Sequence, residues 1–315
     1  MTRTLAALLA LILATPLAHA QPPAPMGAVR QAAPPSPAEA IAAFEAAVSR
    51  DVIAVDFIER DTPDGPIRGF VARINLAAPG IDIAVTDPLD TPPADNVEGI
   101  LEPTDAWAKR VNATLAVNAN FFSWLNRDEG WTDLIGLSAS DGQIVSPRRT
   151  YQGVADAALV FDDQGQARIV PAGQPIDAVY DAVSGVGASD SVPTRNGLLV
   201  TAGENTAMTT RVAPEVRHPR TAAGVTDDGK ALILMVIDGR QPDWSIGIDL
   251  VDLADLMIEY GSHTALNLDG GGSSAFVLRH PDTGELIAQN RPSDGDFRAV
   301  ANSIGVRLLD TPEPR

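Results

Sequence analysis

The sequence contains no cysteine among its 315 residues. This absence excludes disulfide bridges, thiolate metal sites, iron–sulfur clusters and cysteine nucleophiles. Basic residues are scarce as well, because 23 Lys and Arg face 41 Asp and Glu and leave a formal net charge of −18. Nucleic-acid binding requires basic side chains that neutralise phosphates. No nucleic acid is therefore expected as a partner.

Long apolar runs are also missing. The longest are Leu5–Ala14 and Ala231–Ile237, and both are shorter than the roughly 20 residues of a membrane-spanning helix. No integral membrane span is expected. The first run follows Arg3 and precedes a small-residue segment that ends at Ala20, which is the layout of a secretory signal peptide. Residues 1–20 are predicted to be cleaved near Ala20, which makes the protein periplasmic or secreted.

The remaining chain divides by composition. A segment rich in proline and alanine, which stays extended and solvated, comes first. Ser36, Pro37 and Glu39 then form the signature of a helix N-terminus with a capping box. Short Val- and Ile-rich runs between Gly, Pro and Asp turns follow, and they indicate a sheet-dominated domain. We predict a signal peptide, a tether, an N-terminal helix, one large domain and a tail over residues 1–20, 21–36, 37–50, 51–309 and 310–315.

The predicted fold class is α+β, with one sheet-dominated mixed domain that contains a βαβ unit and two hairpins lining the site. Two helices are expected within it, near 105–111 with Thr104 as its cap and near 249–260 with Gly261 at its end. The strands are predicted near 52–59, 67–75, 81–86, 113–118, 134–138, 157–161, 167–170, 221–226, 231–237, 264–268, 274–279 and 300–308.

The βαβ unit brings two aspartates together. Ala231–Ile237 is apolar throughout, as in a strand buried on both faces, and it ends at Asp238. Thr264–Leu268 ends at Asp269, and the helix near 249–260 lies between the two strands. Such a crossover joins parallel strands, whose carboxyl ends lie at the same edge of the sheet. Asp238 and Asp269 are therefore expected to be neighbours.

A first hairpin is predicted to return basic groups to this edge. Its turn contains Asp228 and Gly229 between two apolar runs. Pairing residue 226 with residue 230 sets 220 opposite 236 and 218 opposite 238. His218 and Arg220 are thus expected beside Asp238.

A second hairpin turns at Pro281–Gly284 and pairs residue 280 with residue 285, which returns Asn290 to Ser274. The loop that follows is expected to lie over Gly270–Gly272. Three glycines after a buried strand let the backbone approach a ligand closely, and their successive amides can form an anion-binding nest. The alternative is a close-packed turn without a ligand.

Three arginines, Arg220, Arg240 and Arg298, are expected near the glycine run. In a strongly acidic protein such a group can neutralise a phosphate, because guanidinium groups bind phosphate oxygens through paired hydrogen bonds. The alternative is that these arginines lie on the surface and balance the acidic excess.

At these residues the sequence resembles a known family. The stretches LAVNANFF, HPRTAAGVT, VIDGRQPDWSIGI, ALNLDGGGSSAFVL and NRPSDGDFRAVANSIGV are similar, in order and spacing, to the phosphodiester glycosidases. The resemblance covers residues 67–308. It implies an exported hydrolase that cleaves the glycosidic C–O bond next to phosphate in a sugar-1-phosphodiester of an envelope or extracellular glycan. The segment from Ser184 to Val216 is longer than in the family, so the identity of the sugar is not carried over.

Position in the chain, together with the resemblance, suggests roles for individual residues. Asp269 is expected to be the nucleophile or the base that activates water, and Asp238 the partner acid or a group that orients a hydroxyl. Phe121 and Phe122 are assigned to the core. No cofactor and no metal ligands are assigned. The residues expected to bind the substrate or its phosphate are Asn118, Asn120, His218, Arg220, Thr221, Arg240, Asn267, Gly270, Gly271, Gly272, Ser273, Ser274, Asn290 and Arg298.

Two other functions remain open at this stage. The first is a metal-dependent phosphodiesterase that breaks the P–O bond, with Asp238 and Asp269 as metal ligands. The second is a non-catalytic envelope protein that binds polysaccharide in the same cleft. In that case Trp124, Trp131 and Trp244 are candidates for stacking on sugar rings, whereas Trp107 is more typical of a core residue.

Overall fold

The computed structural model describes residues 36–148, 150–151, 154–185, 197–209 and 214–309. The predicted signal peptide, the tether up to residue 35 and the tail lie outside these ranges, as does part of the segment from Ser184 to Val216. The first described element is α1 (Pro37–Ala47), whose N-cap is Ser36 with the expected capping box to Glu39. Helix α1 packs against the first strand through the buried Phe44.

The largest sheet has seven strands, and every hydrogen-bonded pair in it is antiparallel. Its strands are, in spatial order, β1 (Ile53–Thr62), β2 (Gly65–Asn75), β19 (Ala231–Ile237), β18 (Arg220–Val225), β20 (Thr264–Asn267), β16 (Val200–Thr201) and β17 (Glu204–Asn205).

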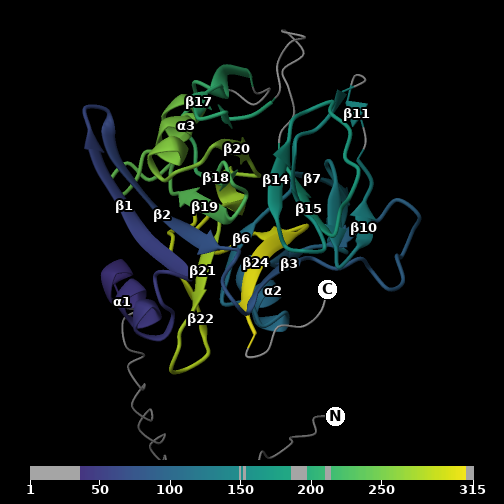
Figure 1. Ribbon diagram of the computed structural model, residues 1–315, viewed down its shortest axis with the longest axis horizontal. Helices are drawn as coiled ribbons and strands as arrows, with labels where there is room; N and C mark the ends of the chain where they lie inside the picture. Colours follow the sequence, from purple (N-terminus) through teal and green to yellow (C-terminus); the bar gives the residue numbers. More distant parts are fainter. Residues whose placement is uncertain (1–35, 149, 152–153, 186–196, 210–213, 310–315) are drawn as a thin grey trace, which may run out of the picture. The chain divides into compact units, whose positions relative to one another are not determined.

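Two five-stranded sheets complete the main framework (Figure 1). The first is ordered β22 (Leu286–Ala288), β21 (Phe276–Arg279), β6 (Leu115–Asn118), β24 (Ser303–Leu308) and β3 (Ile81–Val85). The second is ordered β10 (Gln143–Ser146), β9 (Ser138–Ser140), β15 (Asp181–Ser184), β13 (Ala158–Phe161) and β14 (Ala167–Val170).

Smaller sheets lie in the connections. They are formed by β4 (Gly99–Ile100), β8 (Trp131–Leu134) and β7 (Phe122–Asn126), by β5 (Glu102–Pro103) with β23 (Ala299–Val300), and by β11 (Thr150–Tyr151) with β12 (Val154–Ala155). The other helices are α2 (Thr104–Arg110), α3 (Leu250–Glu259) and the short 3₁₀ turns η1 (Ala207–Thr209) and η2 (Gly271–Ser273). None of the helices in the described ranges has the length and apolar character needed to cross a bilayer.

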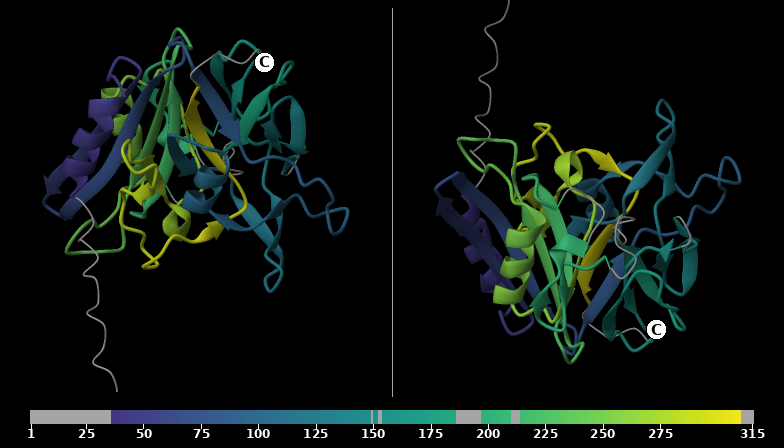
Figure 2. Two further views of the ribbon diagram at one scale, coloured as in Figure 1. Left: turned by 90° about the horizontal axis from the view of Figure 1, so that it is seen from below. Right: turned by 90° about the horizontal axis from the view of Figure 1, so that it is seen from above.

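The sequence of β19 is apolar throughout because both faces of the strand are buried. Leu234 on one face belongs to the core shared with the β6 sheet, and Ile233 and Met235 on the other face pack with α3. Every residue of β19 is buried. A strand covered on both faces has no solvent side, so it needs no polar residues in alternation. The views in Figure 2 show α3 lying against this sheet.

The β19–α3–β20 unit forms as predicted, with one difference. Strands β19 and β20 are parallel, but β18 lies between them and pairs antiparallel with both. The carboxyl ends of β19 and β20 therefore share one edge of the sheet, separated by the start of β18 at Arg220. The fold class expected from the sequence is confirmed: a sheet-dominated α+β domain with a βαβ unit and two hairpins.

The two hairpins differ in how well their registers were predicted. In the second, Val277 pairs with Ala288, which is the expected register. In the first, Arg220 pairs with Ile237 instead of Val236. The expected register was wrong by one residue because the turn contains Lys230 in addition to the three expected residues, and Thr226 pairs with Ala231.

Two other local predictions were wrong. No strand runs through 134–138, because Gly136 has a φ of 83° and separates β8 from β9. Thr104 is not the cap of α2 but its first residue, and Pro103 takes the N-cap position without a side-chain hydrogen bond. The Thr104 hydroxyl instead bonds the Ser303 hydroxyl at 3.1 Å. A buried partner from β24 has replaced the local capping interaction.

Candidate active site

A pocket of about 190 Å³ opens where β18 begins and β20 ends. Its lining contains one carboxylate, three guanidinium groups, an imidazole, a phenyl ring and a glycine run. Half of the site residues expected from the sequence line this pocket. Phe121, which was not expected there, lines it as well. The lining residues are Phe121, His218, Arg220, Arg240, Asp269, Gly270, Gly271, Gly272 and Arg298.

Glycine is needed in this run because neighbouring groups lie too close to leave room for a side chain. A Cβ on Gly270 would lie 2.7 Å from the carbonyl oxygen of Pro219, and a Cβ on Gly272 would lie 2.2 Å from the Arg298 guanidinium. Gly271 has a φ of 62°, which side chains rarely adopt. The run therefore folds so that two arginines lie directly against its backbone, since Arg240 is also within 3.1 Å of a Cβ placed on Gly271.

The expected nest of free amides does not form. The amides of Gly270 and Gly271 donate to the Asp269 carboxylate and to Pro219, at 2.9 and 2.8 Å. The amides of Ser273 and Ser274 close the η2 turn. In the described part of the chain only the Gly272 N–H of this run has no hydrogen-bond partner. The run winds into a 3₁₀ turn, so positive charge in the pocket comes from side chains.

Asp269 is held at the base of this turn. Its N–H donates to the Ala119 carbonyl at 2.9 Å, and its own carbonyl accepts from Asn118 Nδ2 at 2.7 Å. Burial raises the pKa of the Asp269 carboxyl to about 6, against the opposing influence of the Gly270 amide and Arg298. A carboxyl group with a pKa near neutrality suits proton transfer at physiological pH.

Arg220 is the most buried cation of the pocket, at 6 % exposure. Burial lowers its pKa to about 10, with Asp249 opposing and Arg240 adding to the effect. Its guanidinium donates to the carbonyls of Val216 and Ile248, at 2.8 and 3.4 Å. A buried guanidinium group is a favourable place for an anion, because an opposite charge compensates the cost of burial.

Arg240 and Arg298 complete the cationic wall. Arg240 has a φ of 61°, a left-handed conformation that is unfavourable for a non-glycine residue and that clusters at functional sites. Arg298 binds Asp294 through Nε at 3.1 Å and Nη2 at 2.5 Å. Asp294 was not expected from the sequence, and it fixes the Arg298 fork against Gly272.

His218 and Phe121 are the remaining side chains of the lining. Burial lowers the pKa of His218, and Arg220 and Arg240 lower it further, which favours the neutral imidazole. Phe121 had been assigned to the core, but it is only partly buried and lines the pocket. Phe122 is also partly exposed and packs on Trp124 with ring centroids 5.7 Å apart. The core assignment of both residues was wrong: Phe121 precedes β7 and lines the pocket, and β7 belongs to the small β4–β8–β7 sheet, where none of its residues is fully buried.

Asp238 lies outside the pocket lining and is 1 % exposed. Its Oδ2 accepts from Trp244 Nε1 at 2.8 Å, and its Oδ1 accepts from Asn290 Nδ2 at 3.0 Å. The Arg291 amide bonds both oxygens. Burial raises the pKa of Asp238, and these donors oppose the rise. The carboxylate links the loop that contains Trp244 to the loop that contains Asn290 and Arg291, and it is not exposed to the pocket.

Asn118 likewise lies outside the lining. Its side chain donates to the Asp269 carbonyl and accepts from the Ala275 amide at 3.1 Å and the Thr221 hydroxyl at 2.7 Å. Asp269 and Ala275 flank the glycine turn, so this one buried amide fixes both of its ends.

The other expected site residues are buried supports. Asn120 donates to the carbonyls of Ile135 and Leu137 and accepts from the Ser184 amide. Asn290 accepts from the Phe276 amide at 2.7 Å. Six expected residues of this kind lie outside the pocket lining in addition to Asp238 and Asn118: Asn120, Thr221, Asn267, Ser273, Ser274 and Asn290.

Among the described residues, no group of three or more His, Asp and Glu side chains is arranged to hold a metal ion.

Comparison with known proteins gives one curated relative and several solved structures. The chain is 32 % identical over 204 residues, 64 % of its length, to the uncharacterized protein YomE derived from the SPbeta prophage of Bacillus subtilis (strain 168). The match spans 29 % of that protein, so the chain corresponds to less than a third of its curated relative.

The fold is similar to two solved structures. The catalytic domain of zebrafish N-acetylglucosamine-1-phosphodiester alpha-N-acetylglucosaminidase, auto-inhibited by its pro-peptide, superposes with a TM-score of 0.58 at 21 % identity and covers 81 % of this chain and 83 % of that one. A hypothetical protein from Synechocystis gives 0.51 at 17 % identity, over 82 % and 62 % of the two chains.

The family model of the phosphodiester glycosidases matches residues 111–307. That range contains β6, the βαβ unit, the glycine turn and every residue of the pocket lining. The chain belongs to the phosphodiester glycosidase family.

Proposed function

We propose that this chain hydrolyses the bond between the anomeric carbon of a sugar and a phosphodiester oxygen, with Asp269 as the base or nucleophile. The observation that carries the proposal is the composition of the small pocket. One carboxyl group whose pKa is about 6 shares it with three guanidinium groups. Such a site can hold an anionic leaving group beside a carboxylate that acts on carbon.

The three guanidinium groups serve the leaving group in this proposal. A phosphomonoester leaves as a weakly basic anion, so it needs less proton donation than an alcohol would. Arg220 is buried beside the turn and donates to the carbonyls of Val216 and Ile248, and Arg240 lies against the glycine turn. Preorganised positive charge that faces developing negative charge lowers the barrier.

Asp269 acts at the anomeric carbon. The C–O bond to phosphate breaks, and the phosphomonoester departs with the bridging oxygen and both bonding electrons. Water supplies the new oxygen on the sugar, and its proton passes to the Asp269 carboxylate. Asp238 and Asn118 position the loops around Asp269 and do not touch the substrate.

We infer that the reaction takes place outside the cytoplasm. The support is the signal-peptide pattern of residues 1–20. The substrate would then be a phosphodiester-linked sugar or polysaccharide of the envelope or its surroundings. N-terminal sequencing of the protein from a culture medium or periplasmic extract tests this directly, and a mature N-terminus that still contains residues 1–20 would contradict it.

Turnover of a panel of sugar-1-phosphodiesters by the wild type and Asp269→Asn tests the proposed activity. Asparagine keeps the shape of the side chain and its bond to the Gly270 amide, so the substrate should still bind. We expect turnover to fall by about three orders of magnitude or more, because a group that acts in the transition state is removed. Asp294→Asn is the matched control, since it removes a carboxylate that holds Arg298 and should lower affinity more than turnover. Near-normal turnover of Asp269→Asn would contradict the proposal.

A further inference from the structure

Three tryptophans of the sequence are candidates for stacking on a sugar ring, and the structure separates them. Trp244 packs on Phe57 with ring centroids 6.1 Å apart, and the Arg291 guanidinium lies 4.3 Å from its ring centroid. Trp131 is partly buried in the middle strand of the β4–β8–β7 sheet. Trp124 of β7 is 40 % exposed. It is the one of the three whose aromatic surface is largely open to solvent.

Strand β7 begins next to the candidate active site. Phe121, which lines that pocket, directly precedes the strand, and its carbonyl accepts from the Ile135 amide at 2.8 Å at the base of the β7–β8 hairpin. Trp124 lies three residues further along, which is at most about 10 Å of extended strand. Both views of Figure 2 show this hairpin projecting on the same side of the molecule as the loop between β22 and β23. A ligand that extends out of the pocket past Phe121 therefore comes close to Trp124.

The face of the hairpin that carries Trp124 is directed toward the segment after Arg298. Trp124 pairs with Thr132, and Thr132 pairs with Gly99, so these side chains lie on one face of the small sheet. A Cβ on Gly99 would lie 3.0 Å from the carbonyl oxygen of Ala301 and 3.0 Å from Thr132 Oγ1. This face thus meets the chain just beyond Arg298, which is one of the three guanidinium groups of the pocket.

Two neighbours hold the Trp124 ring in place. The Phe122 ring meets it at an angle of 64° with centroids 5.7 Å apart, and the Arg127 guanidinium lies 4.8 Å from its centroid. An aromatic side chain that is already ordered loses little conformational entropy when a ligand binds. Asp128 and Glu129 follow Arg127 and leave the hairpin tip with a net negative charge. The surface formed by Phe122, Trp124 and Arg127 is therefore better suited to an uncharged ring than to a second phosphate.

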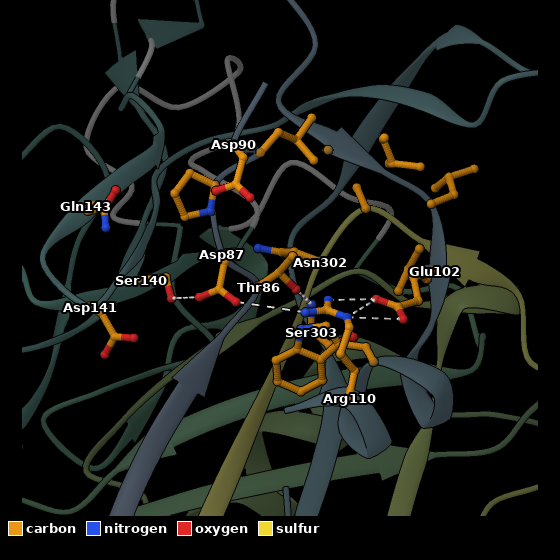
Figure 3. A pocket seen from close by; sticks show the side chains of 18 residues that line it. Thr86, Asp87, Asp90, Glu102, Arg110, Ser140, Asp141, Gln143, Asn302 and Ser303 are labelled. Carbon is orange, nitrogen blue, oxygen red and sulfur yellow. Dashed lines mark hydrogen bonds and ion pairs between the residues drawn. The ribbon is translucent and has the colours of Figure 1, made fainter. Parts of the chain in front are cut away.

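The size of the pocket calls for binding contacts outside it. Its volume of about 190 Å³ is below the roughly 300 to 1,000 Å³ that is typical of small-molecule sites. A substrate larger than a sugar phosphate must therefore make further contacts elsewhere. The larger cavity of about 730 Å³ in Figure 3 does not suit a phosphodiester, because four carboxylates and one guanidinium line it.

We propose that Trp124 is a specificity-determining residue that binds an uncharged sugar ring on the alcohol side of the phosphodiester. The alcohol side is favoured because the Trp124 face meets the segment beyond Arg298. Arg298 holds the phosphate in the proposed function, and the alcohol is attached to that phosphate. The apolar face of a pyranose packs on the indole ring, while its hydroxyl groups stay in water. The inference rests on the proposed function, because it takes the phosphate to lie at the three arginines.

Calorimetry on the Asp269→Asn protein tests the inference without requiring turnover. Methyl diesters of a panel of sugar 1-phosphates are titrated first, and the one that binds most tightly is compared with two diesters of the same sugar 1-phosphate. In the first of these, the glucosyl diester, the alcohol is O6 of methyl glucoside. In the second, the hexyl diester, it is an alkyl chain without hydroxyl groups.

We expect the glucosyl diester to bind about tenfold more tightly than the methyl diester. Adding Trp124→Ala should remove this difference and leave the affinity for the methyl diester within about twofold. Leu125→Ala is the matched control, since it truncates a side chain of nearly equal exposure, 39 %, in the same strand, and the difference should persist. Trp124→Phe keeps an aromatic ring and should retain most of it. A structural role for Trp124 would instead weaken the binding of both diesters alike.

The outcomes separate this inference from the proposed function. Binding of the methyl diester with no gain for the glucosyl diester, or a gain that survives Trp124→Ala, would overturn the role of Trp124 and leave the phosphate site intact. A hexyl diester that binds as tightly as the glucosyl diester would overturn the assignment of a sugar. If no methyl diester bound, the phosphate site of the proposed function would fail, and this inference would fail with it.

Discussion

Replacing Asp269 by asparagine should make the protein more stable at pH 8 and leave it nearly unchanged at pH 4. The reason is that burial raises the pKa of Asp269 from an ordinary 3.8 to about 6. The folded state therefore holds this proton up to about pH 6, whereas the unfolded chain releases it near pH 4. Stability falls with rising pH wherever the folded state binds more protons.

The size of the effect follows from the two pKa values. One pH unit corresponds to about 1.4 kcal/mol, so the difference between 3.8 and about 6 gives about 3 kcal/mol at most. The loss develops between pH 4 and pH 6 and is complete above pH 7. The substituted asparagine has no charge to bury, and it keeps an oxygen for the Gly270 amide. The variant should thus exceed the wild type by about 1 to 3 kcal/mol at pH 8.

Urea unfolding at pH 4, 5, 6, 7 and 8 measures this difference. Because other titrating groups are common to both proteins, they cancel in the comparison. Asp163→Asn, on an exposed turn, is the control and should stay within about 0.5 kcal/mol of the wild type. If Asp269→Asn were no more stable than the wild type at pH 8, the carboxylate would not be desolvated as argued.

Four further predictions concern the same site. Arg298→Lys keeps the charge but loses the fork that Asp294 holds, so calorimetry with a sugar 1-phosphate should show about tenfold weaker binding; an unchanged Kd would contradict this. Arg240→Asn relieves a left-handed arginine and should raise stability by about 0.5 kcal/mol in urea unfolding while weakening the same binding. Asn118→Ala breaks three buried hydrogen bonds and should lower the free energy of unfolding by about 3 kcal/mol. With Asp269 as base, kcat/KM should rise with pH to a plateau above about pH 6, and a fall above that pH would assign it as an acid.

The sequence was sufficient to predict which chain segments meet at the candidate site, because strand direction determines which loops lie at the same edge of a sheet. Seven apolar residues in a row identified β19, and the helix after it required β20 to run parallel. The parallel strands placed Asp269 at the edge where β19 ends, and the first hairpin returned Arg220 to the same edge. The insertion of β18 between the two strands was not evident, since a hairpin can lie on either side of its neighbour.

The amino-acid sequence did not predict the direction in which individual side chains point. Asp238 and Asn118 follow strand ends just as Asp269 does, but both point into packed regions and bind backbone groups there. A sequence motif does not distinguish buried residues that hold the loops in place from residues that line the pocket. Only the packing distinguishes them, because each buried polar group must find its own partner.

The register of the first hairpin illustrates a second limit. A turn that contains Asp and Gly can close over three or four residues, and here Lys230 belongs to the turn. A shift of one residue reverses which side chains face the core. The error did not displace the site, because His218 lies beyond the strand and is fixed by its backbone bonds to Ile248.

Identifying which bond is cleaved tests the central claim most directly. A sugar-1-phosphodiester is hydrolysed by the wild type in water enriched in oxygen-18, and both products are examined by mass spectrometry, with Asp269→Asn as the inactive control. Attack at the anomeric carbon predicts that the heavy oxygen appears on the sugar and that the phosphomonoester remains unlabelled. Label in the phosphomonoester would mean attack at phosphorus, and it would contradict the proposed role of Asp269 at carbon.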